Sequence, residues 1–101
     1  MTVKLVVLYT RPDDVEAFDE HYLDVHAPLV EKLPGLLRWE GARLVAAPDG
    51  GDVVYHRMAE LWFEDQAALD GALGSAEGQA TAADYGRIAP PGSRMFVAVV
   101  D

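Results

Sequence analysis

The sequence predicts an α+β domain of the ferredoxin-like class, built on one four-stranded antiparallel sheet. Patterned segments follow one another in the order strand, helix, strand, strand, helix, strand, and the two middle strands are separated by a clear turn sequence, Pro48 to Asp52. The simplest solution for this order packs both helical regions on one face of the sheet. With 101 residues the chain has room for one core. We therefore expect residues 1–101 to form a single domain.

Four segments have the composition of strands. Val3–Thr10 and Arg94–Val100 are apolar on both alternating faces, which is typical of strands covered on both sides. Leu36–Ala47 and Val53–Phe63 alternate instead, and the turn between them is rich in Gly and Asp, which tolerate the backbone angles that a hairpin needs. The sequence therefore predicts an interior first strand and a central hairpin.

The longest helical pattern runs from Asp13 to Leu33. Asp13 and Glu16 match a capping box, so the helix is predicted to begin at Asp13. Apolar side chains recur at spacings of three and four, which places them on one buried stripe. The stripe consists of Val15, Phe18, Tyr22, Val25, Leu29 and Leu33.

A proline interrupts this helix beside a histidine. Pro28 has no backbone N–H and pushes Ala27 away from helical angles, so we expect a kink or break near His26 and Ala27. Tyr22 lies four residues before His26, so the two rings are expected on the same side. They are candidates for a site. The alternative is that His26 only donates to a carbonyl freed by the proline and that Tyr22 only packs.

The second helical region runs from Asp65 to Arg87 and has mostly Ala at its apolar positions. Gly74 and Ser75 divide it into two short helices. Asp65 and Ser75 are the predicted N-caps, because each can accept a hydrogen bond from the first helical turn.

Charge and composition exclude several function classes. Lys and Arg number 8 against 17 Asp and Glu, which gives a net charge of −9 that repels nucleic acid and anionic membranes. The chain contains no Cys, so disulfides, thiolate metal sites and a cysteine nucleophile are excluded. The short apolar run Leu5–Tyr9 is interpreted as a strand rather than a signal peptide. We expect a cytoplasmic protein with no nucleic-acid or membrane partner.

The predicted sheet has one face without a cover. Two helical regions can cover only one side of the sheet, while the first strand and the last strand are apolar on both of their faces. We therefore predict a homodimer in which two sheets pack face to face.

Several segments together resemble a known family. They are the Leu8-Tyr9-Thr10-Arg11-Pro12 end of the first strand, the helix with Asp13, Phe18, Tyr22 and His26-Ala27-Pro28-Leu29, the following Leu33-Pro34-Gly35-Leu36, and the looser late pattern Phe63, Leu69, Ala72, Ser75 and Asp84. On these residues the chain resembles the EthD-domain family of the dimeric α+β barrel group. The resemblance implies a small dimeric protein that breaks down or tailors small organic molecules, by ether degradation, polyketide cyclisation or decarboxylation. Many similar proteins are cofactor-independent enzymes.

We expect the site in a pocket between the sheet and the kinked helix. His26 is the predicted general acid or base, because its ordinary pKa near ~6.5 is easily moved across neutrality. Tyr22 or Tyr9 is expected to donate a hydrogen bond to a developing oxyanion. The residues predicted to line the pocket are Tyr9, Phe18, Leu29, Trp39, His56, Trp62 and Phe96.

Neither a metal nor a cofactor is predicted. His21 and His26 would point about 140° apart on an α-helix at ~100° per residue, and His56 lies on a distant strand. The acidic run Asp19-Glu20-His21 and Asp24 is interpreted as a solvated helix face.

Three functions stay open. The first is a cofactor-independent oxygenase, cyclase, decarboxylase or isomerase acting on a small, largely apolar, aromatic or polyketide-like compound. The second is a non-catalytic binding or accessory protein that uses the same pocket. The third is a haem-binding barrel with His26 or His56 as the axial ligand.

Overall fold

The computed structural model describes all 101 residues. Its elements are β1 (Val3–Thr10), α1 (Val15–His21), the π-helix η1 (Tyr22–His26), α2 (Ala27–Glu31), β2 (Leu36–Arg43), β3 (Tyr55–Phe63), α3 (Gln66–Gly74), α4 (Ala76–Ile88) and β4 (Arg94–Val99). The strands form one antiparallel sheet in the order β2-β3-β1-β4, with β1 in the interior. The predicted ferredoxin-like fold is confirmed.

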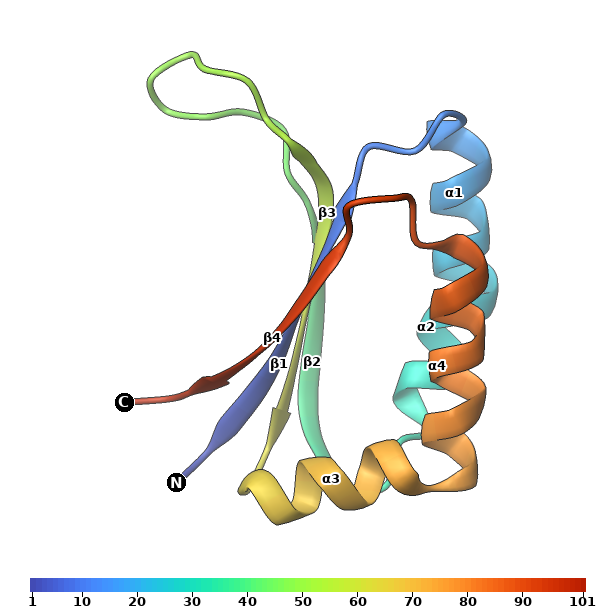
Figure 1. The fold of residues 1–101 in the computed structure, drawn as a ribbon, viewed down its shortest axis with the longest axis vertical. Helices are drawn as coiled ribbons and strands as arrows, with labels where there is room; N and C mark the ends of the chain where they lie inside the picture. Colours follow the sequence, from blue (N-terminus) through green and yellow to red (C-terminus); the bar gives the residue numbers. More distant parts are fainter.

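Helices cover one face of the sheet and leave the other open (Figure 1). The continuous helical segment α1–η1–α2 and helix α4 run along the same face, while α3 crosses one end of the sheet. The link between β2 and β3, residues 44–54, projects beyond the layers. No helix is both long and apolar enough to span a membrane.

Alternation along β1 builds the core between these layers. Val3, Leu5, Val7 and Tyr9 are all buried and face the helices, and the intervening residues face the other way. Each is paired across β3 with a residue of the same face, for example Leu5 with Leu61. The buried cluster therefore joins the sheet to the helical segment that carries His26.

The open face is mixed rather than mostly apolar. Lys4 of β1 pairs with Glu60 of β3 at 2.7 Å, and the Arg38 guanidinium of β2 lies 3.8 Å from the ring centre of Trp62. Between β1 and β4 the same face carries the apolar pair Val6 and Phe96, with the Arg94 guanidinium 5.7 Å from the centre of the Phe96 ring. The face expected to bury against a partner thus has both polar and apolar surface.

The third strand does not alternate strictly at its start. Tyr9 pairs with Arg57 and Thr10 with Tyr55, so His56 is an extra residue in β3. Strict alternation would place His56 and Arg57 on opposite faces, and this prediction is wrong. Both side chains reach Asp19 on α1. The bulge turns His56 toward the helices.

Two of the three predicted helix starts are confirmed. The Asp65 and Ser75 side chains accept from the backbone N–H groups of Ala68 and Gly78. At the first helix, however, Asp14 and not Asp13 accepts from Ala17, at 3.0 Å. That prediction was wrong by one residue.

The predicted break before Pro28 is absent. Ala27 has helical angles, φ −56° and ψ −43°, and its N–H donates to the carbonyl of Tyr22 five residues earlier. This wider π turn changes the helical register at the point where Pro28 supplies no N–H, and Pro28 then occupies the first turn of α2. The irregularity expected near His26 and Ala27 is thus present as a π turn, while Ala27 itself keeps helical angles.

The extra residue also shifts the buried stripe. Val25 is 44% exposed and Leu29 is half-buried, although both were predicted to face the core. The buried positions after Tyr22 are His26, Ala27, Val30 and Leu33. Because of the π turn, His26 takes the buried position that was predicted for Val25.

Candidate functional site

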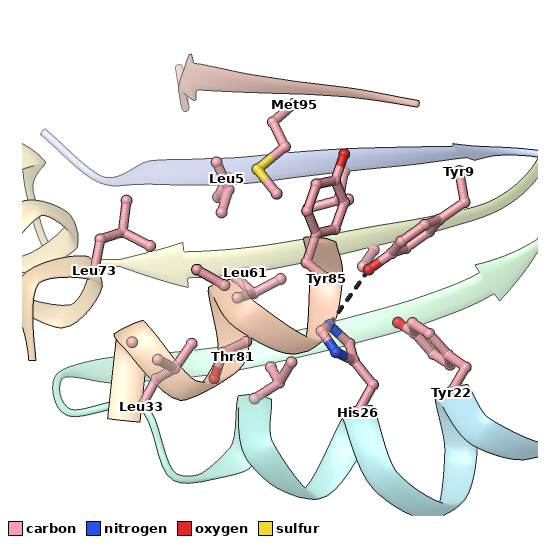
Figure 2. A pocket seen from close by; sticks show the side chains of 15 residues that line it. Leu5, Tyr9, Tyr22, His26, Leu33, Leu61, Leu73, Thr81, Tyr85 and Met95 are labelled. Atoms are coloured by element: carbon pink, nitrogen blue, oxygen red, sulfur yellow. Dashed lines mark hydrogen bonds between the residues drawn. The ribbon is translucent and has the colours of Figure 1, made fainter. Parts of the chain in front are cut away.

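A cavity of about 250 Å³ lies between the sheet and the helices. Most of its wall is aliphatic and comes from β1, β3 and the helical layer, as Figure 2 shows. The polar groups on the wall belong to Tyr9, Tyr22, His26, Thr81 and Tyr85. The cavity thus has the form of a small-molecule site, apolar with a few polar groups that fix orientation.

The π-helix η1 brings two histidines to one carboxylate. His26 Nδ1 lies 2.8 Å from Asp84 Oδ2, and His21 Nε2 lies 2.9 Å from Asp84 Oδ1. On a regular α-helix these histidines would diverge, which is why the sequence predicted that they could not act together. The extra residue per turn reduces the angle between them, so both reach α4.

Tyr9 completes the hydrogen bonds of His26. The Tyr9 hydroxyl lies 3.3 Å from His26 Nε2 (Figure 2). Since the Asp84 carboxylate can only accept, His26 Nδ1 carries the hydrogen and Nε2 accepts from Tyr9. The side of the imidazole that faces the cavity is therefore its basic nitrogen.

Burial and hydrogen bonding set the charge states of this group. Burial lowers the pKa of His26 from 6.5, and this outweighs the opposing effect of the hydrogen bond and charge of Asp84. Burial would raise the pKa of Asp84, but hydrogen bonds from His21 and His26 outweigh it and hold that pKa below its ordinary value. Burial raises the pKa of Tyr9 far above its usual range. The resting group is a neutral imidazole between a carboxylate and a phenol.

Tyr22 has a buried hydroxyl without a partner. It is the one buried side-chain polar atom in the protein that makes no hydrogen bond. The Arg57 guanidinium lies 4.5 Å from the centre of the Tyr22 ring. Burial raises the pKa of Tyr22 to about 12, with a smaller opposing effect of Arg57, so the phenol stays protonated. Its O–H is available to an acceptor in the cavity.

A second buried group lies behind the aromatic wall. Asp19 Oδ1 accepts from His56 Nε2 at 2.8 Å and from Arg57 at 3.2 Å. Burial would raise the pKa of Asp19, but these two partners outweigh it and lower the pKa. Asp19 and His21 were both interpreted as solvated surface. Asp19 is instead held by His56 and Arg57, whereas His21 is partly exposed and also contacts Asp84. Glu20 and Asp24 are exposed.

The structure brings three of the predicted site residues together on the cavity wall. These are Tyr9, Tyr22 and His26. Phe18 lies behind them, with its ring centre 5.4 Å from that of Tyr9 in an edge-to-face contact.

The other predicted pocket residues lie elsewhere. Leu29 faces a shallow surface depression between α2 and α4, and Trp39 lies on the helix-facing side of β2 beside Gly41. His56 contacts Asp19. Trp62 and Phe96 are on the open face of the sheet, away from the cavity. Single-sequence patterns did not show which face each strand aromatic occupies.

The sequence did not identify Asp84, His21 or Tyr85 as site residues. Asp84 entered only through the loose late pattern of the resemblance. A carboxylate in the later turns of an alanine-rich helix was the available signal, since such a group must find donors when its helix packs. No group of three or more His, Cys, Asp or Glu side chains is arranged to hold a metal ion.

Comparison with known proteins identifies two similar chains. A Rhodococcus erythropolis protein described as an uncharacterized 11.0 kDa protein in the thcB-thcC intergenic region is 36% identical over 93 residues, covering 92% of this chain and 89% of that protein. The crystal structure of an ethyl tert-butyl ether D (EthD) family protein from Bacillus halodurans C-125 has a TM-score of 0.94 and 36% identity, over 100% of both chains.

Two more distant structures share the fold. SnoaB, a cofactor-independent oxygenase from Streptomyces nogalater, has a TM-score of 0.71 and 16% identity over 99% of this chain and 93% of its own. A dimeric ferredoxin-like protein from Thermobifida fusca has a TM-score of 0.76 and 10% identity, over 99% and 92%. At these identities the likeness shows the fold alone.

The model of the EthD domain matches residues 11–91, which include the whole helical layer and most of the cavity wall. On this match and the two relatives at 36% identity, the chain belongs to the EthD-domain family.

Proposed function

We propose that this protein is a cofactor-independent enzyme that removes a proton from a small, largely apolar organic compound in the cavity. The observation that carries the proposal is the buried His26, whose Nδ1–H is held by Asp84 while Nε2 faces the cavity through Tyr9. A neutral imidazole oriented by a carboxylate is the arrangement of an effective general base. The fold shared with a cofactor-independent oxygenase is consistent with this reading.

The proton passes through Tyr9. The substrate gives its proton to the Tyr9 oxygen while the Tyr9 hydrogen moves to His26 Nε2, so Tyr9 is unchanged and His26 becomes an imidazolium. The electron pair left on the substrate is delocalised onto a substrate oxygen. The unpaired Tyr22 hydroxyl donates to that oxygen and stabilises its charge.

These roles define the substrate class. It carries an acidic C–H or O–H conjugated with an oxygen, as in phenols and enolisable aromatic or polyketide-like ketones. The cavity of about 250 Å³ lies just below the ~300–1,000 Å³ of sites for drug-sized ligands, so it suits a compact ring system. A cavity of this size favours such a compound over haem.

A non-catalytic binding protein is the second candidate. The observation that favours it is that Tyr9 already occupies His26 Nε2, so the imidazole has no free lone pair. On this reading His26 and Asp84 only position Tyr9 as a hydrogen-bonding group for a ligand.

Turnover of a panel of phenols and enolisable ketones by the wild type, His26→Ala and Tyr22→Phe distinguishes the enzyme from the binding protein. We expect His26→Ala to lose about 10²–10⁴-fold in turnover and Tyr22→Phe about 10²-fold, while Tyr22→Phe remains at least as stable because it removes an unsatisfied buried hydroxyl. Full turnover by folded His26→Ala contradicts the catalytic role. Tight ligand binding with no product, and equal affinity in His26→Gln, supports the binding protein.

A further inference from the structure

One buried carboxylate joins the cavity to solvent through two imidazoles. Asp84 is 1% exposed and His26 is 4% exposed, whereas the His21 side chain is 37% exposed. His21 Nε2 lies within 3.1 Å of both Asp84 oxygens, and His26 Nδ1 lies 2.8 Å from one of them. The three side chains therefore form one continuous polar group from the cavity wall to the surface.

We infer that His21 is a charge-compensating partner of His26, with one positive charge shared between the two imidazoles across Asp84. In the resting protein His21 carries the charge and His26 is neutral. When His26 Nε2 gains the substrate proton by way of Tyr9, His21 releases a proton from Nδ1 to solvent. One proton enters the group and one leaves it, and Asp84 remains ionised.

The reason is electrostatic. A single buried carboxylate can neutralise one imidazolium, and a second cation in the same site would be buried without compensation, which is strongly unfavourable. His21 is the imidazole that solvent can reach, so it holds the charge most easily at rest. The positive charge of His21 is also one of the factors that lower the pKa of His26.

Other charged and titratable groups around this pair do not replace His21. The Arg87 guanidinium is 3.5 Å from Asp84 Oδ1, but its side chain is 68% exposed, so solvent screens its charge. The remaining groups that face the pair are Tyr9 from β1, Tyr22 from η1, Tyr85 from α4, and Glu20 and Asp24 on the helix of His21 itself.

The test is an NMR titration of the imidazoles in the substrate-free protein, so it does not need the substrate. We expect His21→Gln to shift the His26 midpoint upward, because a competing charge is removed. Asp84→Asn should shift it downward, because the stabilising carboxylate is lost.

His56→Gln is the matched control, because His56 pairs with Asp19 and not with Asp84. It should leave the His26 midpoint in place. A His26 midpoint that stays fixed or falls in His21→Gln overturns the inference.

The inference rests on the proposed role of His26 as base, but the two fail in different experiments. Coupled midpoints together with full turnover by His26→Ala would remove the proposed function and keep the charge sharing. A His26 midpoint that does not depend on His21, together with an inactive His26→Ala, would remove the charge sharing and keep the proposed function.

Discussion

At the scale of single residues, His26 shows how burial and a partner act in opposite directions on one imidazole. Burial in the helical layer lowers its pKa, whereas the hydrogen bond to Asp84 raises it, and burial prevails. Asp84 shows the reverse balance, because two imidazole donors outweigh the effect of its burial on the pKa. The site is held in a state with one carboxylate and a neutral base.

These shifts predict how stability depends on pH. Below pH 6.5 the unfolded chain protonates His26 while the folded protein does not, so the free energy of unfolding should fall as the pH is lowered. It should fall further below pH 3.8, because the pKa values of Asp84 and Asp19 are lowered in the fold. Urea unfolding at a series of pH values measures both windows.

The variant His26→Gln is the control for the upper window. It cannot gain a proton, so its stability should change less between pH 6.5 and 3.8 than that of the wild type. Equal slopes for the two proteins in this window would contradict the pKa shift of His26.

The sequence predicted one half of the site for a physical reason. Tyr9 lies on a predicted strand and Tyr22 belongs to the predicted apolar stripe, and the spacing of four residues placed His26 on the same side as Tyr22. Asp84 and His21 depend on the register between two helices, and that register includes a π turn. A pattern read with a period of 3.6 residues cannot show where such a turn occurs.

At the scale of elements, the π-helix is the feature that organises the helical layer. It moves His26 into the buried stripe, rotates His21 toward α4 and accommodates Pro28. The elements themselves followed from the sequence, because the strands and caps are local signals. The bulge at His56 and the π turn were missed because each inserts one residue that only tertiary packing requires.

Close packing of α3 against α4 depends on Gly78. A Cβ at this position would lie 2.1 Å from the carbonyl oxygen of Ala72, which is backbone and cannot move aside. We therefore expect Gly78→Ala to destabilise the protein by about 1–3 kcal/mol. Chemical denaturation measures the change.

Gly86→Ala on the same helix is the matched control. A Cβ there meets no atom within 4 Å, so replacing glycine in the helix should stabilise the protein by about 0.5–1 kcal/mol. Similar effects of the two substitutions would show that helix propensity, and not the helix contact, governs Gly78.

At the scale of the whole molecule, the one-sided helical layer leaves the second face of the sheet uncovered (Figure 1). The order of elements was enough to predict this arrangement, but not the ion pair and stacked Arg38 on the open face, because those depend on neighbours in adjacent strands. A fold neighbour from Thermobifida fusca is dimeric. From the apolar part of the open face around Phe96 we expect a homodimer to form through this face.

Sedimentation equilibrium at micromolar protein tests the dimer. The wild type should return roughly twice the chain mass of 11.0 kDa. Phe96→Glu should shift the protein toward monomer, because it places a charge on the apolar part of the open face. Leu23→Glu, on the exposed surface of η1, is the control and should remain dimeric. A wild-type protein that sediments as a monomer would contradict the predicted face-to-face packing of two sheets.

The cavity reaches the surface past two apolar side chains. Leu73 and Met95 are each 42% exposed and both line the cavity. Crossing such a rim strips water from whatever passes, which costs little for a neutral compound and much for an ion. The rates at which compounds enter the cavity should therefore increase with their oil–water partition coefficients. An anion formed inside is retained until it is neutralised, so departure of the product waits for the return of a proton.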